Sequence, residues 1–232
     1  MRGTAAYCRL MTMQLERRGD VFVLNVGDDE NRLNPMWVEG VAEALTEVTA
    51  TEGPRALVTI GSGKFWSNGL DLDWMAAHGD ESPAFLARVH ALFGAFLASE
   101  VPTVAAVQGH AFAAGAMLAV AHDRVLMRAD RGYWCVPEVD LGLPFTAGMS
   151  ALLQARLAQP TAHEAMTTGR RYTGPEAVSA GIAATSHDLD ELLDAAVTWA
   201  GTQASKAGPT LATIKQGMYS TALRVLAADD AG

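Results

Sequence analysis

The sequence has little cysteine, no long apolar run and no excess of basic residues. Its two cysteines, Cys8 and Cys135, are too few for a disulfide framework. No apolar run reaches the roughly 18 residues that a membrane-spanning helix needs, and no segment has the pattern of a signal peptide. These absences predict a cytoplasmic protein with no membrane partner. A C-terminal peroxisomal tripeptide is absent as well.

Positive charge is also scarce, with 17 lysines and arginines against 26 acidic residues and a net charge of −9. A nucleic-acid-binding surface needs clustered basic residues, so nucleic acid is excluded as a partner. The six histidines show no metal-ligand spacing and no C-x-x-C motif occurs, so we predict no metal site. We also find no internal repeat.

The chain does have ample apolar material, since half of its 232 residues are hydrophobic. One large domain, or a domain with a helical tail, suits that length. Alternation predicts a hairpin from Met13–Arg17 and Val21–Val26, and an Asn34-Pro35 cap predicts a helix to about Thr51. A strand over Ala56–Ile60 and later helices then indicate an α/β fold with a mixed sheet.

The central stretch is VPTVAAVQGHAFAAGAM, from Val101 to Met117. Its β-branched first half predicts a buried strand, and at Gly109 the pattern changes to small residues that suit the start of a helix. Such residues let a ligand approach the backbone N–H groups that the first helical turn leaves unpaired. Tight helix packing would explain the same small residues.

Residues 57 to 72 repeat this design with an apolar strand, a Gly/Ser loop and Asn68-Gly69-Leu70-Asp71 before a short helix. Asp71 is the expected N-cap. Two such turns that converge would offer two N–H donors to one oxygen. The third stretch is WCVPEVDLGLP, residues 134 to 144, where the apolar setting of Glu138 should raise its pKa.

In this order and spacing, the three stretches resemble the crotonase superfamily of enoyl-CoA hydratases and isomerases. The resemblance implies a spiral of ββα units over residues 12–158 and a C-terminal helical trimerisation region over 159–232. It assigns the oxyanion-hole N–H groups to Leu70, before Asp71, and to Ala114, in the middle of Ala113-Ala114-Gly115. Hydratases of the family carry a second glutamate two residues after that turn, where this sequence has Met117.

With Glu138 as the single carboxylate, the resemblance is nearest to the Δ3,Δ2-enoyl-CoA isomerase branch. It implies that Glu138 takes a proton from C2 of a 3-enoyl-CoA and returns it at C4, with the enolate held by the two N–H groups. The acyl-CoA thioester is then the substrate, no cofactor is needed, and the assembly is a homotrimer or hexamer. The alternatives are a hydratase, another crotonase-type reaction on acyl-CoA, or an acyl-CoA-binding protein without turnover.

Residues that could contact the substrate or its CoA lie around the two turns. Arg32, Leu33 and Lys64 precede the first turn, and Lys215 matches a C-terminal lysine that approaches a CoA phosphate in relatives; surface lysines are often only solvated. Trp66, Trp74, Phe112 and Met117 could line the acyl pocket, although core packing would also explain the aromatic residues. The first loop contributes Ser67, Asn68, Gly69 and Asp71.

Four other side chains receive more modest interpretations. Asp140 follows Glu138 by two residues, so in an extended segment it would face the same side, and an ion-pair or capping role is the main alternative. His110 is expected to bond to backbone, and Cys135 to lie in a buried strand. Ser67 lacks the G-x-S-x-G context of a serine hydrolase.

The first dozen residues, including Cys8, fit no element and suggest a short extension or an upstream start codon.

Overall fold

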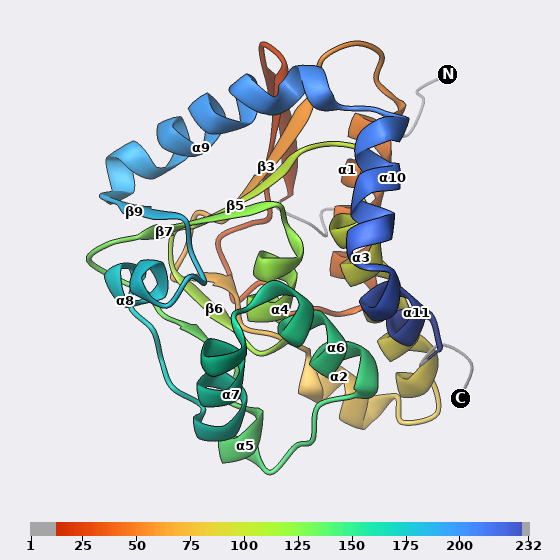
Figure 1. The fold of residues 1–232 in the computed structure, drawn as a ribbon. Helices are drawn as coiled ribbons and strands as arrows, with labels where there is room; N and C mark the ends of the chain where they lie inside the picture. Colours follow the sequence, from red (N-terminus) through yellow and green to blue (C-terminus); the bar gives the residue numbers. More distant parts are fainter. Residues whose placement is uncertain (1–12, 229–232) are drawn as a thin grey trace, which may run out of the picture.

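The computed structural model describes residues 13–228, so the interpretations of Cys8 and of the first dozen residues lie outside the described range. Within that range the chain repeats a unit of two strands followed by helix (Figure 1). The four units comprise β1 (Gln14–Arg18), β2 (Val21–Asn25) and α1 (Pro35–Ala50); β3 (Ala56–Ile60), β4 (Phe65–Ser67), α2 (Leu72–Ala77) and α3 (Ser82–Leu97); β5 (Thr103–Val107), β6 (His110–Phe112) and α4 (Ala114–Ala121); and β7 (Arg124–Arg128), β8 (Trp134–Cys135) and α5 (Glu138–Leu141).

From the second unit onward, the two strands of a unit enter two different sheets. The larger sheet has the order β1-β2-β3-β5-β7-β9, where β9 is Thr185–His187, and it is parallel except for the β1–β2 hairpin; the smaller parallel sheet has the order β4-β6-β8. From β3 onward, the first strand of each unit therefore extends the large sheet and the second extends the small one. This confirms the crotonase-like spiral that the resemblance implies.

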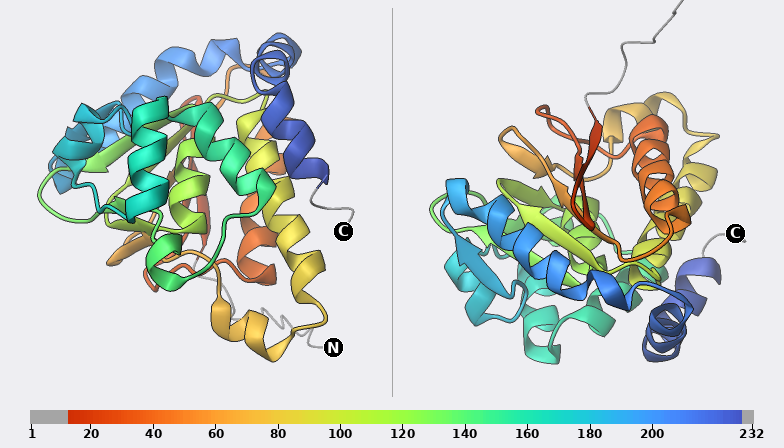
Figure 2. Two further views of the ribbon diagram at one scale, coloured as in Figure 1. Left: turned by 60° about the horizontal axis from the view of Figure 1, so that its bottom comes forward. Right: turned by 90° about the horizontal axis from the view of Figure 1, so that it is seen from above.

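Alternation along the strands of the large sheet builds a core on each of its faces. Val21 and Val23 of β2 pack with helix α9 (Leu189–Gln203), whereas Phe22 and Leu24 face the core formed with α1, α3 and α4. Side chains alternate between the faces of a strand, so five-residue strands can supply both cores. Figures 1 and 2 show α9 along one side of this sheet, with the other helices on the opposite side.

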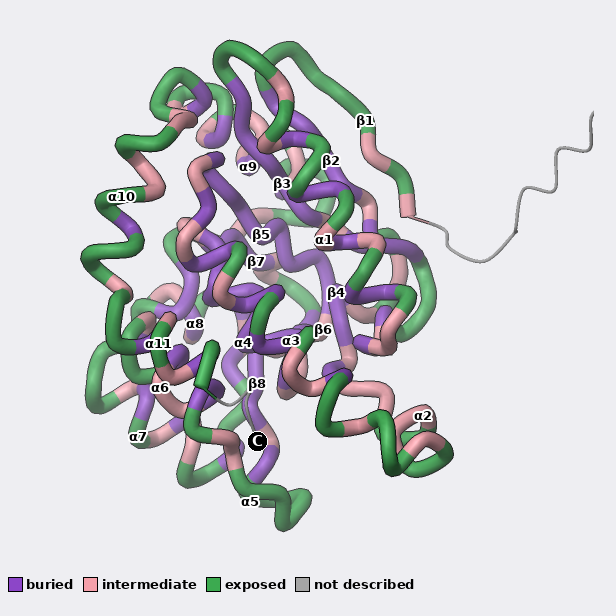
Figure 3. Tube along the Cα trace, turned by 90° about the vertical axis from the view of Figure 1, so that its right-hand side faces the viewer, coloured by how far each residue is buried: buried purple, intermediate pink, exposed green. Residues whose placement is uncertain are grey.

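The C-terminal part contains the remaining elements α6 (Ala147–Arg156), α7 (Gln159–Thr168), α8 (Gly174–Ser179), β9 (Thr185–His187), α9, a 3₁₀ turn (Ala204–Lys206), α10 (Pro209–Met218) and α11 (Ser220–Ala228). α11 packs against α6 and α3 of its own chain, while much of α10 is exposed (Figure 3). Over residues 13–228, no helix is both long and apolar enough to cross a membrane.

Several local predictions are confirmed, including the hairpin, the strand Ala56–Ile60 and the helix that follows Asn34, whose side chain accepts from Trp37 N at 3.0 Å. Three strands were not predicted. β4 lies within the expected Gly/Ser loop, β6 lies where the small residues after Gly109 suggest a helix, which begins only at Ala114, and β9 lies in a region expected to be helical. Each is three residues long and pairs with strands that are distant in the sequence.

Candidate active site

The turn between β6 and α4 has an unusual backbone at Ala113. This residue has φ 50° and ψ −125°, a combination that residues other than glycine rarely adopt. Its N–H donates to Cys135 O of β8 at 3.0 Å, which fixes the turn to the small sheet. A positive φ at an alanine strains the backbone, because its Cβ crowds the neighbouring peptide group. Such strain costs about 1–3 kcal/mol and is found most often at functional sites.

The first loop is held by the backbone of Leu33. Leu33 N donates to Gly69 O at 2.8 Å, and Asp71 N donates to Leu33 O at 2.9 Å, so these bonds flank Leu70 on both sides. In such a bridge the intervening residue directs its own N–H to the opposite side. Asp71 caps α2 as predicted, because its side chain accepts from Trp74 N at 3.1 Å.

The two turns touch each other, which is the arrangement that two N–H donors need to reach one oxygen. A Cβ on Gly69, which has φ +85°, would lie 2.8 Å from Ala113 Cβ and 3.5 Å from Ala114 N. A Cβ on Gly115 would lie 2.6 Å from Cβ of Ser67. Real side chains do not tolerate such distances, so glycine at both positions allows α4 to pack directly against the loop.

Two backbone N–H groups in this contact have no acceptor. Leu70 N and Ala114 N donate to no protein atom among residues 13–228, although the neighbouring N–H groups of Asp71 and Ala113 do. Ala114 is the first residue of α4, where an N–H has no partner within its own helix. Two unpaired donors on converging turns are suited to bind one developing negative charge.

Glu138 begins α5, three residues beyond the Cys135 carbonyl that binds the α4 turn. Its side chain is buried with 7% of the residue exposed, and among residues 13–228 its Oε2 has no hydrogen-bond partner. Burial raises the pKa of Glu138 to about 7, and no cation of the described chain counteracts this rise. A carboxyl group with this pKa can both take and return a proton near neutral pH.

The structure corrects the expected placement of Asp140. Residues Glu138–Leu141 form a helical turn and not an extended segment, so Asp140 does not share the direction of Glu138. Asp140 is exposed and lies against the Gly169 turn, where a Cβ would meet its Oδ2 at 2.6 Å. Met117, at the position where hydratases of the family have glutamate, is fully buried in the main core.

The expected CoA-binding cations have different surroundings. Arg32 is paired with Glu30 and with Asp73, the latter at 2.9 Å, and it lies 4.0 Å from Asp71. Lys64 is exposed, with Nζ 5.0 Å from the centre of the Phe65 ring. Lys215 is 5% exposed and its Nζ binds Asp123 Oδ2 at 2.7 Å, so its placement opposes the predicted phosphate contact.

Most of the predicted pocket residues also have structural contacts. Trp66 is 1% exposed in the core, Ser67 Oγ donates to Asn31 O at 2.8 Å, and Asn68 Nδ2 lies 3.3 Å from Glu30. Trp74 stacks on His78 and is half-buried, while Phe112 is half-buried near Arg171.

The His110 ring lies 4.9 Å from the Phe112 ring and 5.5 Å from the Tyr133 ring. Its buried Nδ1 has no partner in the part of the chain that the structure describes, so the expected backbone bond is absent there. Burial and nearby cations, among them Lys64 and Arg131, lower its pKa. Cys135 lies in the buried strand β8, as predicted.

The buried carboxyl group and the two N–H donors thus lie on the segments that follow the three strands of the small sheet. The profile of the enoyl-CoA hydratase/isomerase family matches residues 19–230, and the chain belongs to that family. Enoyl-CoA delta isomerase 3 of Arabidopsis thaliana is 37% identical over 227 residues, covering 91% of this chain and 94% of the relative. Enoyl-CoA delta isomerase 2, peroxisomal, of the same plant is 36% identical over 88% of this chain and 91% of its own length.

Solved structures agree on the fold. The apo enoyl-CoA isomerase of Mycobacterium tuberculosis gives a TM-score of 0.83 at 21% identity, covering 95% of this chain and 96% of the other. A family protein from Pseudomonas syringae gives a TM-score of 0.86 at 21% identity, covering 94% and 95% of the two chains. The shared fold includes both sheets and the C-terminal helices.

The strained turn leads to a stability prediction. Ala113→Gly should raise the free energy of unfolding by about 1 kcal/mol, because glycine adopts positive φ without a Cβ clash. The melting temperature should rise by about 2–4 °C for a chain of this size. Thermal unfolding followed by circular dichroism measures the change.

Ala116→Gly in the interior of α4 is the matched control, and it should lower stability by about 1 kcal/mol or more. Equal destabilisation by both substitutions would show that Ala113 is not strained.

Proposed function

We propose that the enzyme shifts the double bond of a 3-enoyl-CoA to give the 2-enoyl-CoA, in fatty-acid degradation. The observation that carries the proposal is Glu138, a single buried carboxyl group whose pKa of about 7 suits proton transfer in both directions. The names of the Arabidopsis relatives support the same reaction.

In this mechanism the thioester oxygen of the substrate accepts hydrogen bonds from Leu70 N and Ala114 N. Ionised Glu138 removes a proton from C2, and the electrons move to the thioester oxygen to form an enolate. Each preorganised donor lowers the barrier by about 3–4 kcal/mol in comparable oxyanion holes. The thioester carbonyl then re-forms, the double bond moves from C3–C4 to C2–C3, and the released C3–C4 electron pair takes the same proton from Glu138 at C4.

Hydration of a 2-enoyl-CoA would require a held and deprotonated water in addition to a proton donor. Family hydratases divide this work between two carboxylates, whereas Met117 cannot hold or deprotonate water. Asp140 does not replace the missing group, because it is exposed and lies against the Gly169 turn. The site therefore favours isomerisation over hydration.

We further propose that the chain assembles as a homotrimer or hexamer. Ile214 and Met218 of α10 are 54% and 67% exposed, and Leu141 of α5 is 55% exposed, so apolar side chains remain for a second copy to cover. Light scattering should give three or six times the chain mass, and a monomer at all concentrations would contradict the assembly.

The cytoplasmic location stays a prediction, since two of the plant relatives are named peroxisomal.

The raised pKa of Glu138 predicts the pH dependence of catalysis. The base must start ionised, so kcat/KM for 3-hexenoyl-CoA should rise with pH and reach half its maximum near pH 7. Glu138→Gln should bind acyl-CoA but lose at least about 99% of kcat at every pH, because the amide cannot take a proton. Steady-state kinetics between pH 5 and 9 measure both effects.

Asp140→Asn is the matched control, since it makes the same change at an exposed carboxylate two residues away. It should leave the pH midpoint and kcat nearly unchanged. A Glu138→Gln variant that keeps more than about a tenth of kcat would remove Glu138 from the mechanism. Hydration of crotonyl-CoA as fast as isomerisation would identify a hydratase.

A further inference from the structure

Helix α4 carries Ala114, but its own side chains do little to fix its position. Its sequence is AGAMLAVA, every residue is buried, and none has a polar side chain. Small apolar residues interlock weakly with their neighbours, so restraints on the ends of the helix gain importance. At the N-terminal end these are the Gly115–Ser67 contact and a bond of 2.9 Å from Trp134 Nε1 to Ala116 O.

At the C-terminal end, the guanidinium of Arg156 in α6 binds three backbone carbonyls. Its nitrogens donate to Val120 O at 2.6 Å, to His122 O at 2.7 Å and to Asp123 O at 3.3 Å. The last carbonyls of a helix lack internal partners and carry partial negative charge, so a planar cation is a strong cap. The protein thus holds the end of α4 from a different helix.

Asp123, two residues beyond α4, connects the end of this helix to β5, the first strand of the same unit. Its Oδ2 accepts from Thr103 N at 2.8 Å and from Lys215 Nζ at 2.7 Å, and its N–H donates to Thr103 Oγ1 at 3.0 Å. Thr103 begins β5 and Lys215 lies in α10. The end of α4 is therefore tied both to β5 and to the C-terminal helices.

Tyr219, at the C-terminal end of α10, completes the connection. Arg156 donates to the Tyr219 hydroxyl, and the guanidinium lies 5.4 Å from the centre of the Tyr219 ring. Arg156 is thus held by α10 while it holds α4. Lys215, expected from the sequence to meet CoA, belongs to this network.

We propose that Arg156 is a positioning residue for the oxyanion hole, which Tyr219 and the Lys215–Asp123 pair connect to the C-terminal helices. The inference rests on the proposed function, because it assigns the position of Ala114 N a catalytic consequence. Arg156 acts through the placement of α4 and touches no substrate. Small displacements of a donor remove much of its effect on the rate, so loosening the far end of α4 should slow the chemical step.

The test is the substitution Arg156→Lys, because an ammonium keeps the charge but lacks the planar fork that reaches several carbonyls. It should lower kcat for 3-hexenoyl-CoA about tenfold and change KM by less than about threefold. A chromophoric probe, 4-dimethylaminocinnamoyl-CoA, gives a second readout. Its absorption shifts to the red when hydrogen bonds polarise the thioester carbonyl, and the shift should be smaller in the variant than in the wild type.

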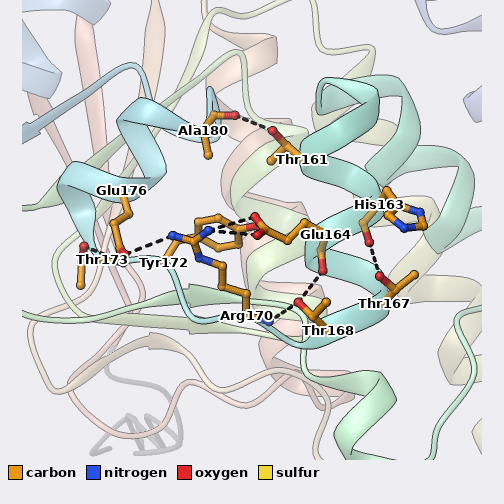
Figure 4. Close-up of polar contacts among 10 residues, drawn as sticks. All are labelled: Thr161, His163, Glu164, Thr167, Thr168, Arg170, Tyr172, Thr173, Glu176 and Ala180. Atoms are coloured by element: carbon orange, nitrogen blue, oxygen red, sulfur yellow. Dashed lines mark hydrogen bonds and ion pairs between the residues drawn. The ribbon is translucent and has the colours of Figure 1, made fainter.

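Arg170→Lys is the matched control. Arg170 forms ion pairs with Glu164 and Glu176 on the surface between α7 and α8 (Figure 4). The same substitution there should leave kcat and the red shift unchanged. Tyr219→Phe removes a single hydroxyl, so it tests the connection should Arg156→Lys not fold, and it should reduce both readouts about twofold or more.

Wild-type kcat and red shift in folded Arg156→Lys, or in Tyr219→Phe if only that variant folds, would overturn the proposal. A wild-type enzyme that neither isomerises 3-hexenoyl-CoA nor shifts the probe would instead overturn the proposed function, and the positioning role with it. These two failures differ in whether the wild type is active.

Discussion

The contact between the Ser67–Leu70 loop and the Ala113–Gly115 turn is the constraint on which the site depends. Glycine at 69 and at 115 lets two backbones approach more closely than any side chain would allow. The contact places Leu70 and Ala114 on adjoining turns with their N–H groups free of protein acceptors within residues 13–228. Ala113 has a positive φ in the same turn. The backbone strain at Ala113 therefore accompanies the placement of the next residue, Ala114.

The two-sheet spiral provides that contact. From β3 onward, each unit sends one strand to the large sheet and one to the small sheet, and the loop or helix after the second strand then lies at a common edge. β4, β6 and β8 are neighbours in this small sheet, and they lead to Leu70, Ala114 and Glu138 respectively. Three residues far apart in the sequence thus follow three adjacent strands.

Much of the fold and of the site could be predicted from the sequence, and the parts that could not be predicted have physical reasons. Asn34 and Asp71 indicate where their helices begin, because capping depends only on neighbouring residues. Glu138 stands in an apolar segment whose burial follows from its composition. β6 and β9 are too short to show a period and exist through pairing. The roles of Lys215 and Arg156 cannot be predicted from the residues next to them in the sequence. The ion pair of Lys215 with Asp123 and the cap that Arg156 places on another helix are tertiary contacts.

The electrostatics of Glu138 set its role apart from the rest of the acidic chain. The pKa of Glu30 is lowered mainly by its bond to Arg32, that of Glu164 by bonds to Tyr172 and Arg170, and that of Glu176 by bonds to Thr173 and Arg170. Glu138 is buried instead, and within residues 13–228 no cation lowers its pKa and its Oε2 has no hydrogen-bond partner. Burying a carboxyl group without partners opposes folding unless it is protonated. A site that keeps such a group loses some stability of the folded protein and gains a carboxyl group suited to proton transfer.

The central claim is that one carboxyl group carries the proton from C2 to C4. It is tested most directly by isomerising 3-hexenoyl-CoA that is fully deuterated at C2 in ordinary water and locating deuterium in the product by mass spectrometry and NMR. Because Glu138 is buried, we expect delivery to C4 to compete with exchange with water, so that a measurable fraction of the product carries deuterium at C4. Product with only protium at C4, from the first turnovers onward, would contradict direct transfer by one carboxyl group.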